Sequence, residues 1–178
     1  MKHLKTLAFH PVHTPLGFLV LAASDNGLAG AWFAGQRHWP DALAAEFPFA
    51  SPQRGGAGWN ADPAHPVLAR ATQQVLDYFT GSRELFNLPL DLSAGTPFQQ
   101  EVWQALLEIP RGKTSSYGAL SANIGRPAAV RAVGGAIGRN PLSIIVPCHR
   151  VIGSAGSLTG YAGGLHRKTA LLQLEGVL

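Results

Sequence analysis

Cysteine is nearly absent from this chain of 178 residues, which contains only Cys148. One cysteine excludes an internal disulfide and a zinc site built from several thiolates, and an unpaired thiol is typical of a reducing compartment. We therefore expect a cytoplasmic protein. We also expect neither a metal nor another cofactor, because no ligand spacing relates the histidines of the first part of the chain, which are His3, His10, His13, His38 and His65.

A long apolar run is absent as well. The apolar stretch 16–23 is far shorter than the ~20 residues that a membrane-spanning helix needs. His10, Pro11, His13 and Pro15 interrupt the segment before it, so the basic start of the chain does not continue into a secretory signal. We expect no association with a membrane.

Acidic side chains are absent between Arg111 and Lys168. Up to Glu108, six Lys and Arg residues accompany nine Asp and Glu residues; after that point eight accompany only Glu175, so the two parts carry net charges of −3 and +7. This asymmetry is typical of a nucleic-acid-binding half. Charge alone is equally compatible with a merely solvated basic face.

The first part of the chain has the pattern of a small α/β domain. Strands are predicted at 4–9, 17–23 and 28–33. Turn residues at 25–27 predict a hairpin between the last two strands. Helical spacing of apolar residues predicts a helix over 66–79. We expect a domain over 1–92 with a small antiparallel sheet and a helix.

The rest of the chain, 93–178, is predicted to be mostly helical. Thr96 has the properties of an N-cap, with Pro97 at the first helical position and Gln99 three residues after the cap, and this helix should run to about Ile109.

A helix-turn-helix is predicted to follow. Ser116 can cap a helix over 117–124 that Gly125 ends, and Pro127 opens another helix. That last helix is built largely from alanine and glycine, which weaken it unless it approaches something closely. Close packing against another helix is one explanation, and entry into a DNA groove, which we favour, is the other.

The tetrapeptide Pro147-Cys148-His149-Arg150 is the strongest candidate for chemistry. A cysteine beside a histidine and among arginines can be an activated nucleophile, because the thiolate is the reactive form. A lone cysteine is also often a small buried apolar residue.

Three segments around this tetrapeptide resemble the O6-alkylguanine-DNA alkyltransferases. They are 140–153 (NPLSIIVPCHRVIG), 159–164 (TGYAGG) and 171–176 (LLQLEG). Segments 112–120 and 125–134 resemble the DNA-reading helices of that family, so the resemblance covers residues 96–176. It implies a ribonuclease-H-like N-terminal domain and a winged helix-turn-helix-like C-terminal domain.

The resemblance also implies an activity and roles for single residues. An alkyl group on guanine O6, with O4-alkylthymine as a second candidate substrate, would move irreversibly to Cys148 in a single turnover. His149 resembles the base that takes the thiol proton through a water, and Glu175 resembles the carboxylate that orients that base. Asn140 resembles the asparagine that ties the turn before the nucleophile. Tyr117 would donate a hydrogen bond to N3 of the leaving guanine. Further residues would line the base pocket: Val146, Val151, Tyr161 and Ala162.

The partner that the resemblance implies is double-stranded DNA with an alkylated guanine, bound by a monomer. Arg131 resembles the arginine that fills the space left by the flipped nucleotide. Contacts with the DNA backbone would come from Gln99, Gly118, Arg126 and Ser154.

Two other functions remain open from the residues alone. A cysteine hydrolase would also use cysteine, histidine and an acid, but the local signatures known around such nucleophiles are missing. A helix-turn-helix protein that binds lesions without reacting would have another residue in place of Cys148, and the intact Pro147-Cys148-His149-Arg150 favours transfer.

Overall fold

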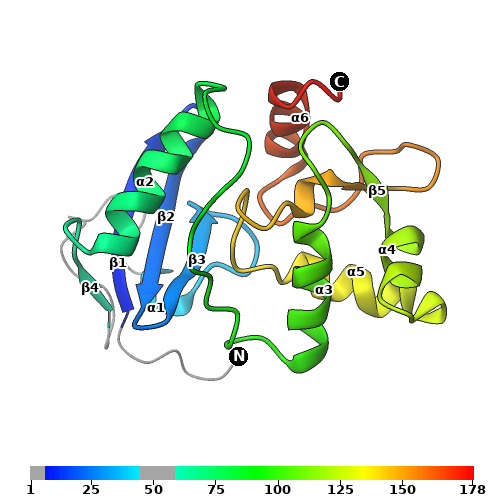
Figure 1. Ribbon diagram of the computed structural model, residues 1–178, viewed down its shortest axis with the longest axis horizontal. Coiled ribbons are helices and arrows are strands. Elements are labelled where there is room, and N and C mark those ends of the chain that lie inside the picture. Colours follow the sequence, from blue (N-terminus) through cyan, green and yellow to red (C-terminus); the bar gives the residue numbers. More distant parts are fainter. Residues whose placement is uncertain (1–6, 45–58) are drawn as a thin grey trace. The chain divides into compact units, whose positions relative to one another are not determined.

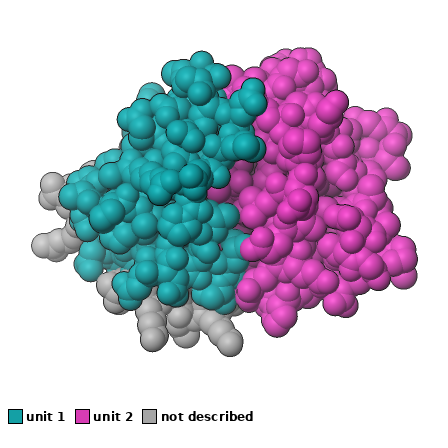
Figure 2. Space-filling view, viewed as in Figure 1, with its two compact units in different colours: residues 1–94 teal, residues 95–178 magenta. Residues whose placement is uncertain are grey.

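The computed structural model describes residues 7–44 and 59–178, and the chain divides into two compact units, Met1–Ala94 and Gly95–Leu178 (Figures 1 and 2). No helix in these described ranges is long and apolar enough to cross a membrane.

The first unit is a four-stranded sheet with a helix on one face. Its order is β3-β2-β1-β4, and α2 packs along β1, β2 and β3 (Figure 1). The elements of this unit are β1 (Leu7–Thr14), β2 (Gly17–Ser24), β3 (Gly27–Phe33), α1 (Asp41–Ala44), β4 (Trp59–Ala61) and α2 (Pro66–Phe79). The α/β class is confirmed, and so are both bounds of the predicted helix.

The sheet is mixed, which corrects the expectation of an antiparallel one. β1, β2 and β3 form the predicted antiparallel meander, but β4 pairs with β1 in parallel. β1 also continues to Thr14, past the predicted end at Phe9, and the predicted residues 4–6 lie outside the described ranges. Pro11 is tolerated in it because β4 pairs only with Leu7–Phe9, so among the described strands Pro11 has a neighbour on one side alone.

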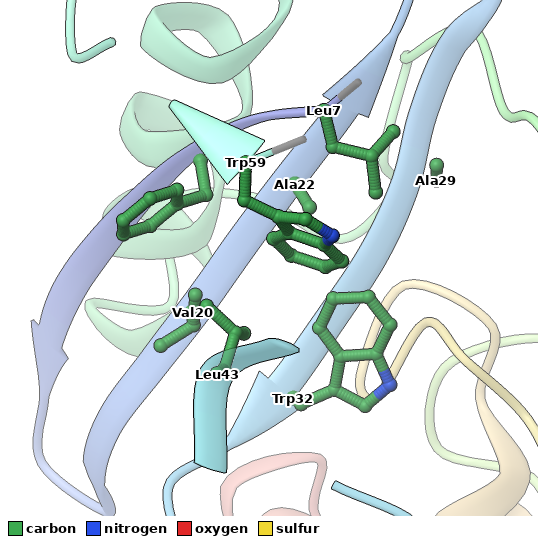
Figure 3. Close-up of a cluster of buried hydrophobic side chains, with 8 residues drawn as sticks. Leu7, Val20, Ala22, Ala29, Trp32, Leu43 and Trp59 are labelled. Atoms are coloured by element: carbon green, nitrogen blue, oxygen red, sulfur yellow. The ribbon is translucent and has the colours of Figure 1, made fainter. Parts of the chain in front are cut away.

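An apolar core fills the face of the sheet next to α1. Figure 3 shows the indole rings of Trp32 and Trp59 meeting there, with centroids 6.0 Å apart, beside Leu43 of α1. Burial of such large side chains is the main source of stability for a domain of this size.

The segment that ends this unit is fastened to the hairpin of β2 and β3. Leu28 N–H donates to Pro89 O, and Asp91 N–H donates to Leu28 O, both at 2.8 Å. Gly27 lies at φ 143°, where a Cβ would meet Pro89 O at 2.5 Å, so only glycine fits this close approach.

The second unit is mostly helical. Its elements are α3 (Pro97–Leu107), β5 (Ser115–Ser116), α4 (Tyr117–Asn123), α5 (Val130–Gly138), β6 (Val151–Ile152) and α6 (Leu165–Leu174), with short 3₁₀ turns at Pro127–Ala129 and Cys148–Arg150. The predicted capping box is present, since the side chains of Thr96 and Gln99 each accept from the other's backbone N–H. Ser116 caps α4 by accepting from Ala119 N–H at 3.0 Å.

Two connections within this unit hold the helix-turn-helix of α4 and α5, one to α3 and the other to the segment after the reactive turn. Trp103 Nε1 of α3 donates to Ala136 O of α5 at 2.9 Å, which fixes the second helix of the pair. β5 and β6 pair in parallel, so the start of α4 lies beside the residues directly after Arg150.

Candidate active site

Cys148 lies in a 3₁₀ turn and is buried, with 5% of its surface exposed. Its Sγ accepts a hydrogen bond from Asn140 Nδ2 at 3.0 Å. Burial raises the pKa of the Cys148 thiol, and the Asn140 bond and the positive charge of Lys168 oppose that rise. The site therefore holds a protonated thiol at rest and offers groups that stabilise its thiolate.

Asn140 fastens the turn that carries the thiol. Its Nδ2 also donates to Val146 O at 2.8 Å, and its Oδ1 accepts from Leu142 N–H at 3.0 Å. Within this turn Ile144 is buried at φ 73°, a left-handed conformation that a β-branched residue rarely adopts. The turn is thus held by buried contacts against backbone strain.

His149 and Glu175 form a buried pair. His149 Nε2 lies 3.0 Å from Glu175 Oε1, and both side chains are fully buried. Burial lowers the pKa of His149, so the imidazole is neutral near pH 7. Since a carboxylate accepts, Nε2 carries the proton and Nδ1 carries the lone pair. In the described part of the chain Nδ1 has no hydrogen-bond partner, which leaves it available as a base.

Arg150 holds the same carboxylate from the other side. Its Nε donates to Glu175 Oε2 at 2.9 Å, its Nη2 donates to Oε1 at 2.8 Å, and its Nη1 donates to Ile109 O at 2.5 Å. Although burial opposes it, bonds from His149 and Arg150 hold the pKa of Glu175 well below its ordinary value. Glu175 is therefore ionised, and it orients the imidazole as a fixed acceptor.

Tyr117 is the first residue of α4, and its hydroxyl donates to Thr159 O at 3.3 Å. A Cβ at Gly134 of α5 would lie 3.7 Å from Tyr117 Cδ1, and one at Gly160 would lie 3.3 Å from the hydroxyl oxygen. Two glycines therefore border the tyrosine, one along its ring and one at its tip.

The four predicted pocket residues lie near the thiol in sequence but differ in exposure. Val146 and Val151 are buried, while Tyr161 and Ala162 are half-buried. The Val146 carbonyl accepts from Cys148 N–H at 2.8 Å as well as from Asn140, so both of its lone pairs are engaged within the protein.

The predicted DNA contacts are mostly exposed. Arg131, Gly118 and Ser154 are exposed on α5, α4 and the loop after β6. Gln99 is half-buried and engaged in the capping box. Arg126 pairs with Glu101 of α3, with Nη2 3.1 Å from Oε2, and its guanidinium lies 5.5 Å from the centre of the Phe98 ring.

Two charged residues of the site were not singled out from the sequence. Arg150 lies in the reactive tetrapeptide, but the sequence pattern predicts no role for it. Lys168 is fully buried, and the sequence pattern identifies it only as one of the basic residues. Lys168, Leu171 and Leu172 of α6 and its C-cap Glu175 are spaced so that they share one helical face, and this spacing could have indicated that Lys168 is buried.

Comparison with known proteins decides the family. The ribonuclease-like domain of 6-O-methylguanine DNA methyltransferase matches residues 7–92, and the DNA-binding domain of the same protein matches residues 97–177. A methylated-DNA--protein-cysteine methyltransferase of Mycobacterium tuberculosis is 44% identical over 94% of this chain and 91% of its own length. The chain belongs to the methylated-DNA--protein-cysteine methyltransferase family.

Other members of this methyltransferase family agree in sequence and in fold. The constitutive methyltransferase of Bacillus subtilis is 43% identical over 91% of both chains. The Mycobacterium tuberculosis OGT, solved in complex with DNA, has a TM-score of 0.82 and 43% identity, with 95% of this chain and 93% of that chain covered. The ribonuclease-like and DNA-binding domains expected from the sequence are thereby confirmed, and so is the family.

Proposed function

We propose that this chain repairs O6-alkylguanine in double-stranded DNA by direct reversal, with Cys148 as the alkyl acceptor. Sγ attacks the alkyl carbon, the bond from that carbon to O6 breaks, and the group remains on sulfur as a thioether. The single observation that carries this proposal is the buried Cys148 beside the His149–Glu175 pair, in a chain that matches methyltransferases over nearly its whole length.

Each proton and charge in the transfer has a candidate group. His149 Nδ1 takes the thiol proton through a bridging water, and Glu175 keeps Nε2 protonated, so the base presents its lone pair. The guanine leaves with negative charge, which a hydrogen bond from the Tyr117 hydroxyl to N3 spreads. Val146, Val151, Tyr161 and Ala162 line the base pocket.

The DNA side of the proposal places the base outside the duplex. Arg131, exposed on α5, fills the vacated space. Gln99, Gly118, Arg126 and Ser154 contact the backbone. Because the substrate is DNA and the thiol must stay reduced, we place a monomeric protein in the cytoplasm, with residues 1–92 and 93–178 as its domains.

Intact mass measurement tests the transfer. Incubation with excess DNA that carries O6-methylguanine should add one methyl group to each molecule, on Cys148, and then stop. Cys148→Ser should bind the same DNA and gain no mass. Turnover beyond one methyl per chain, or transfer at an undiminished rate by Cys148→Ser, contradicts the proposal.

Substrate choice tests the role of Arg131. Arg131→Ala should slow repair of duplex DNA severely, while reaction with free O6-benzylguanine, which needs no flipping, should be nearly unchanged. Arg139→Ala, exposed at the end of the same helix, is the matched control for loss of one positive charge. Equal losses of Arg131→Ala on both substrates would show that Arg131 does not act in flipping.

A further inference from the structure

Lys168 is a charged group of the site whose hydrogen bonds have no part in the proposed reaction, although its charge opposes the rise in the pKa of Cys148. It lies on α6 with its side chain fully buried, and its Nζ donates to Val151 O at 2.5 Å and to Thr159 O at 2.7 Å. A buried ammonium is costly, and a position that requires one is a candidate for a role beyond packing.

The Thr159 carbonyl joins Lys168 to Tyr117. It accepts from the Lys168 ammonium at 2.7 Å and from the Tyr117 hydroxyl at 3.3 Å. The oxygen therefore accepts two hydrogen bonds, a short one from a charged donor and a longer one from a neutral donor. Because the ammonium draws electron density from this oxygen, the oxygen is a weaker acceptor for the hydroxyl.

The glycine that follows Thr159 completes the contact. Gly160 lies at φ 50°, and a Cβ there would stand 3.3 Å from the Tyr117 hydroxyl oxygen. The backbone at 159–160 thus borders the tip of the tyrosine directly, and Lys168 is the side chain that fixes this backbone to the start of β6.

We propose that Lys168 is a positioning residue for Tyr117. Its ammonium holds the Thr159 carbonyl against the Tyr117 hydroxyl and makes that carbonyl a weaker acceptor. The hydroxyl can therefore readily exchange its hydrogen bond to Thr159 O for one to N3 of the entering guanine. This inference rests on the leaving-group role proposed for Tyr117. Burial lowers the pKa of Lys168 to about 8, so the ammonium is still mainly protonated at pH 7.

A double-mutant cycle tests the inference. Lys168→Met, Tyr117→Phe and the double variant are compared for the rate of reaction with free O6-benzylguanine, each divided by the rate of Cys148 alkylation by methyl iodide. The division removes any effect on thiolate formation, because methyl iodide needs the thiolate but no help for a departing guanine. Thr169→Val, also on α6, is the control, because the Thr169 hydroxyl donates to Leu165 O of its own helix.

We expect Lys168→Met to lower the normalised rate by about tenfold and the double variant to react no more slowly than Tyr117→Phe. The control should match the wild type. If the double variant instead loses rate by the product of the two single losses, the proposed role of Lys168 is overturned, while that of Tyr117 is not. An undiminished normalised rate for Tyr117→Phe would instead overturn the proposed role of Tyr117, and this inference with it.

Gly160→Ala tests the same contact if Lys168→Met does not fold. Its Cβ should displace the hydroxyl, lower the normalised rate, and have no further effect in Tyr117→Phe, which lacks the oxygen that the Cβ meets. A wild-type rate for Gly160→Ala would show that the backbone at 159–160 does not position the phenol, and would overturn the inference.

Discussion

The two units bury different kinds of polar group. In the described residues of the first unit, each buried polar side chain bonds to a turn, a strand end or a loop; these side chains are Thr14, Gln36, Gln74 and Asp91. In the second unit, the buried polar side chains include one acid and three basic residues, Glu175, His149, Arg150 and Lys168. The first unit thus uses burial to close turns, while the second keeps ionisable groups together beside a nucleophile.

This difference separates stability from reactivity. Apolar burial stabilises the first unit, where Asp91 is the one buried charged side chain of the described residues. The buried charges of the second unit stabilise it only while every partner is present, because a lone buried charge is costly. Substitutions in the two units should therefore affect different measurements.

The largest effect is expected from Glu175→Gln. The change leaves Arg150 buried with only the Ile109 carbonyl as a full partner, and breaking such a pair costs about 3–5 kcal/mol of unfolding free energy. Glu101→Gln, the same change in an exposed pair, should cost under about 1 kcal/mol. Urea unfolding measures both. Alkyl transfer by Glu175→Gln should also be slower across pH 6 to 9, and an unaltered rate would refute the orienting role.

Leu21→Ala, in the buried middle of β2, tests whether the first unit can lose stability without a change in reactivity. Loss of this side chain is expected to cost about 2–4 kcal/mol through lost burial and a residual cavity. Hydrogen exchange should show the loss in the first unit, while the rate with O6-benzylguanine at a temperature where the protein is folded stays the same. A slower reaction would show that the two units are not separable in this way.

Alkylation itself should destabilise the second unit. A methyl or benzyl group on Sγ weakens the bond from Asn140, because a thioether sulfur is a weak acceptor. It also adds carbon to a buried site, where overpacking costs about 1–3 kcal/mol. Melting curves of unreacted, methylated and benzylated protein should show falling midpoints in that order. Unchanged or raised midpoints would mean that the pocket accepts its product without strain.

The smallest effect concerns mild acid. Burial lowers the pKa of His149 in the second unit. It also lowers the pKa of His10 in the first unit, where the histidine is less completely buried. Below the ordinary histidine pKa, these two side chains bind protons in the unfolded chain but not in the folded one. The free energy of unfolding should therefore fall as the pH falls below about 6.5, by at most ~1.4 kcal/mol per pH unit for each histidine. His149→Gln should reduce this slope more than His10→Gln. The reverse order in urea titrations at pH 7 and 5.5 would contradict the comparison.

Local signals explain what the sequence predicted well. The bounds of α2, the capping box at Thr96 and the cap at Ser116 each depend on residues within a few positions of one another. Continuation of β1 through Pro11 could not be foreseen, because it depends on how far β4 pairs along the other edge.

The candidate site shows the same limit. The resemblance predicted roles for five site residues, because each lies in a sequence segment that matches the family; they are Cys148, His149, Glu175, Asn140 and Tyr117. The pairing of Arg126 with Glu101 joins residues 25 positions apart, and the bond of Lys168 to Thr159 depends on the path of a loop. No sequence periodicity predicts such contacts. The spacing of Lys168 and Glu175, in contrast, could have predicted that they share one helical face.

Ile144 also limits how this protein can be improved by directed evolution. Its left-handed backbone costs about 1–3 kcal/mol, and its buried side chain returns a similar amount. Glycine would relax the backbone but empty the buried space, and any other branched side chain would keep the strain. Selection for heat resistance should therefore leave position 144 unchanged and collect its substitutions elsewhere, so that variants of very different melting temperature still present the same turn to the same sulfur.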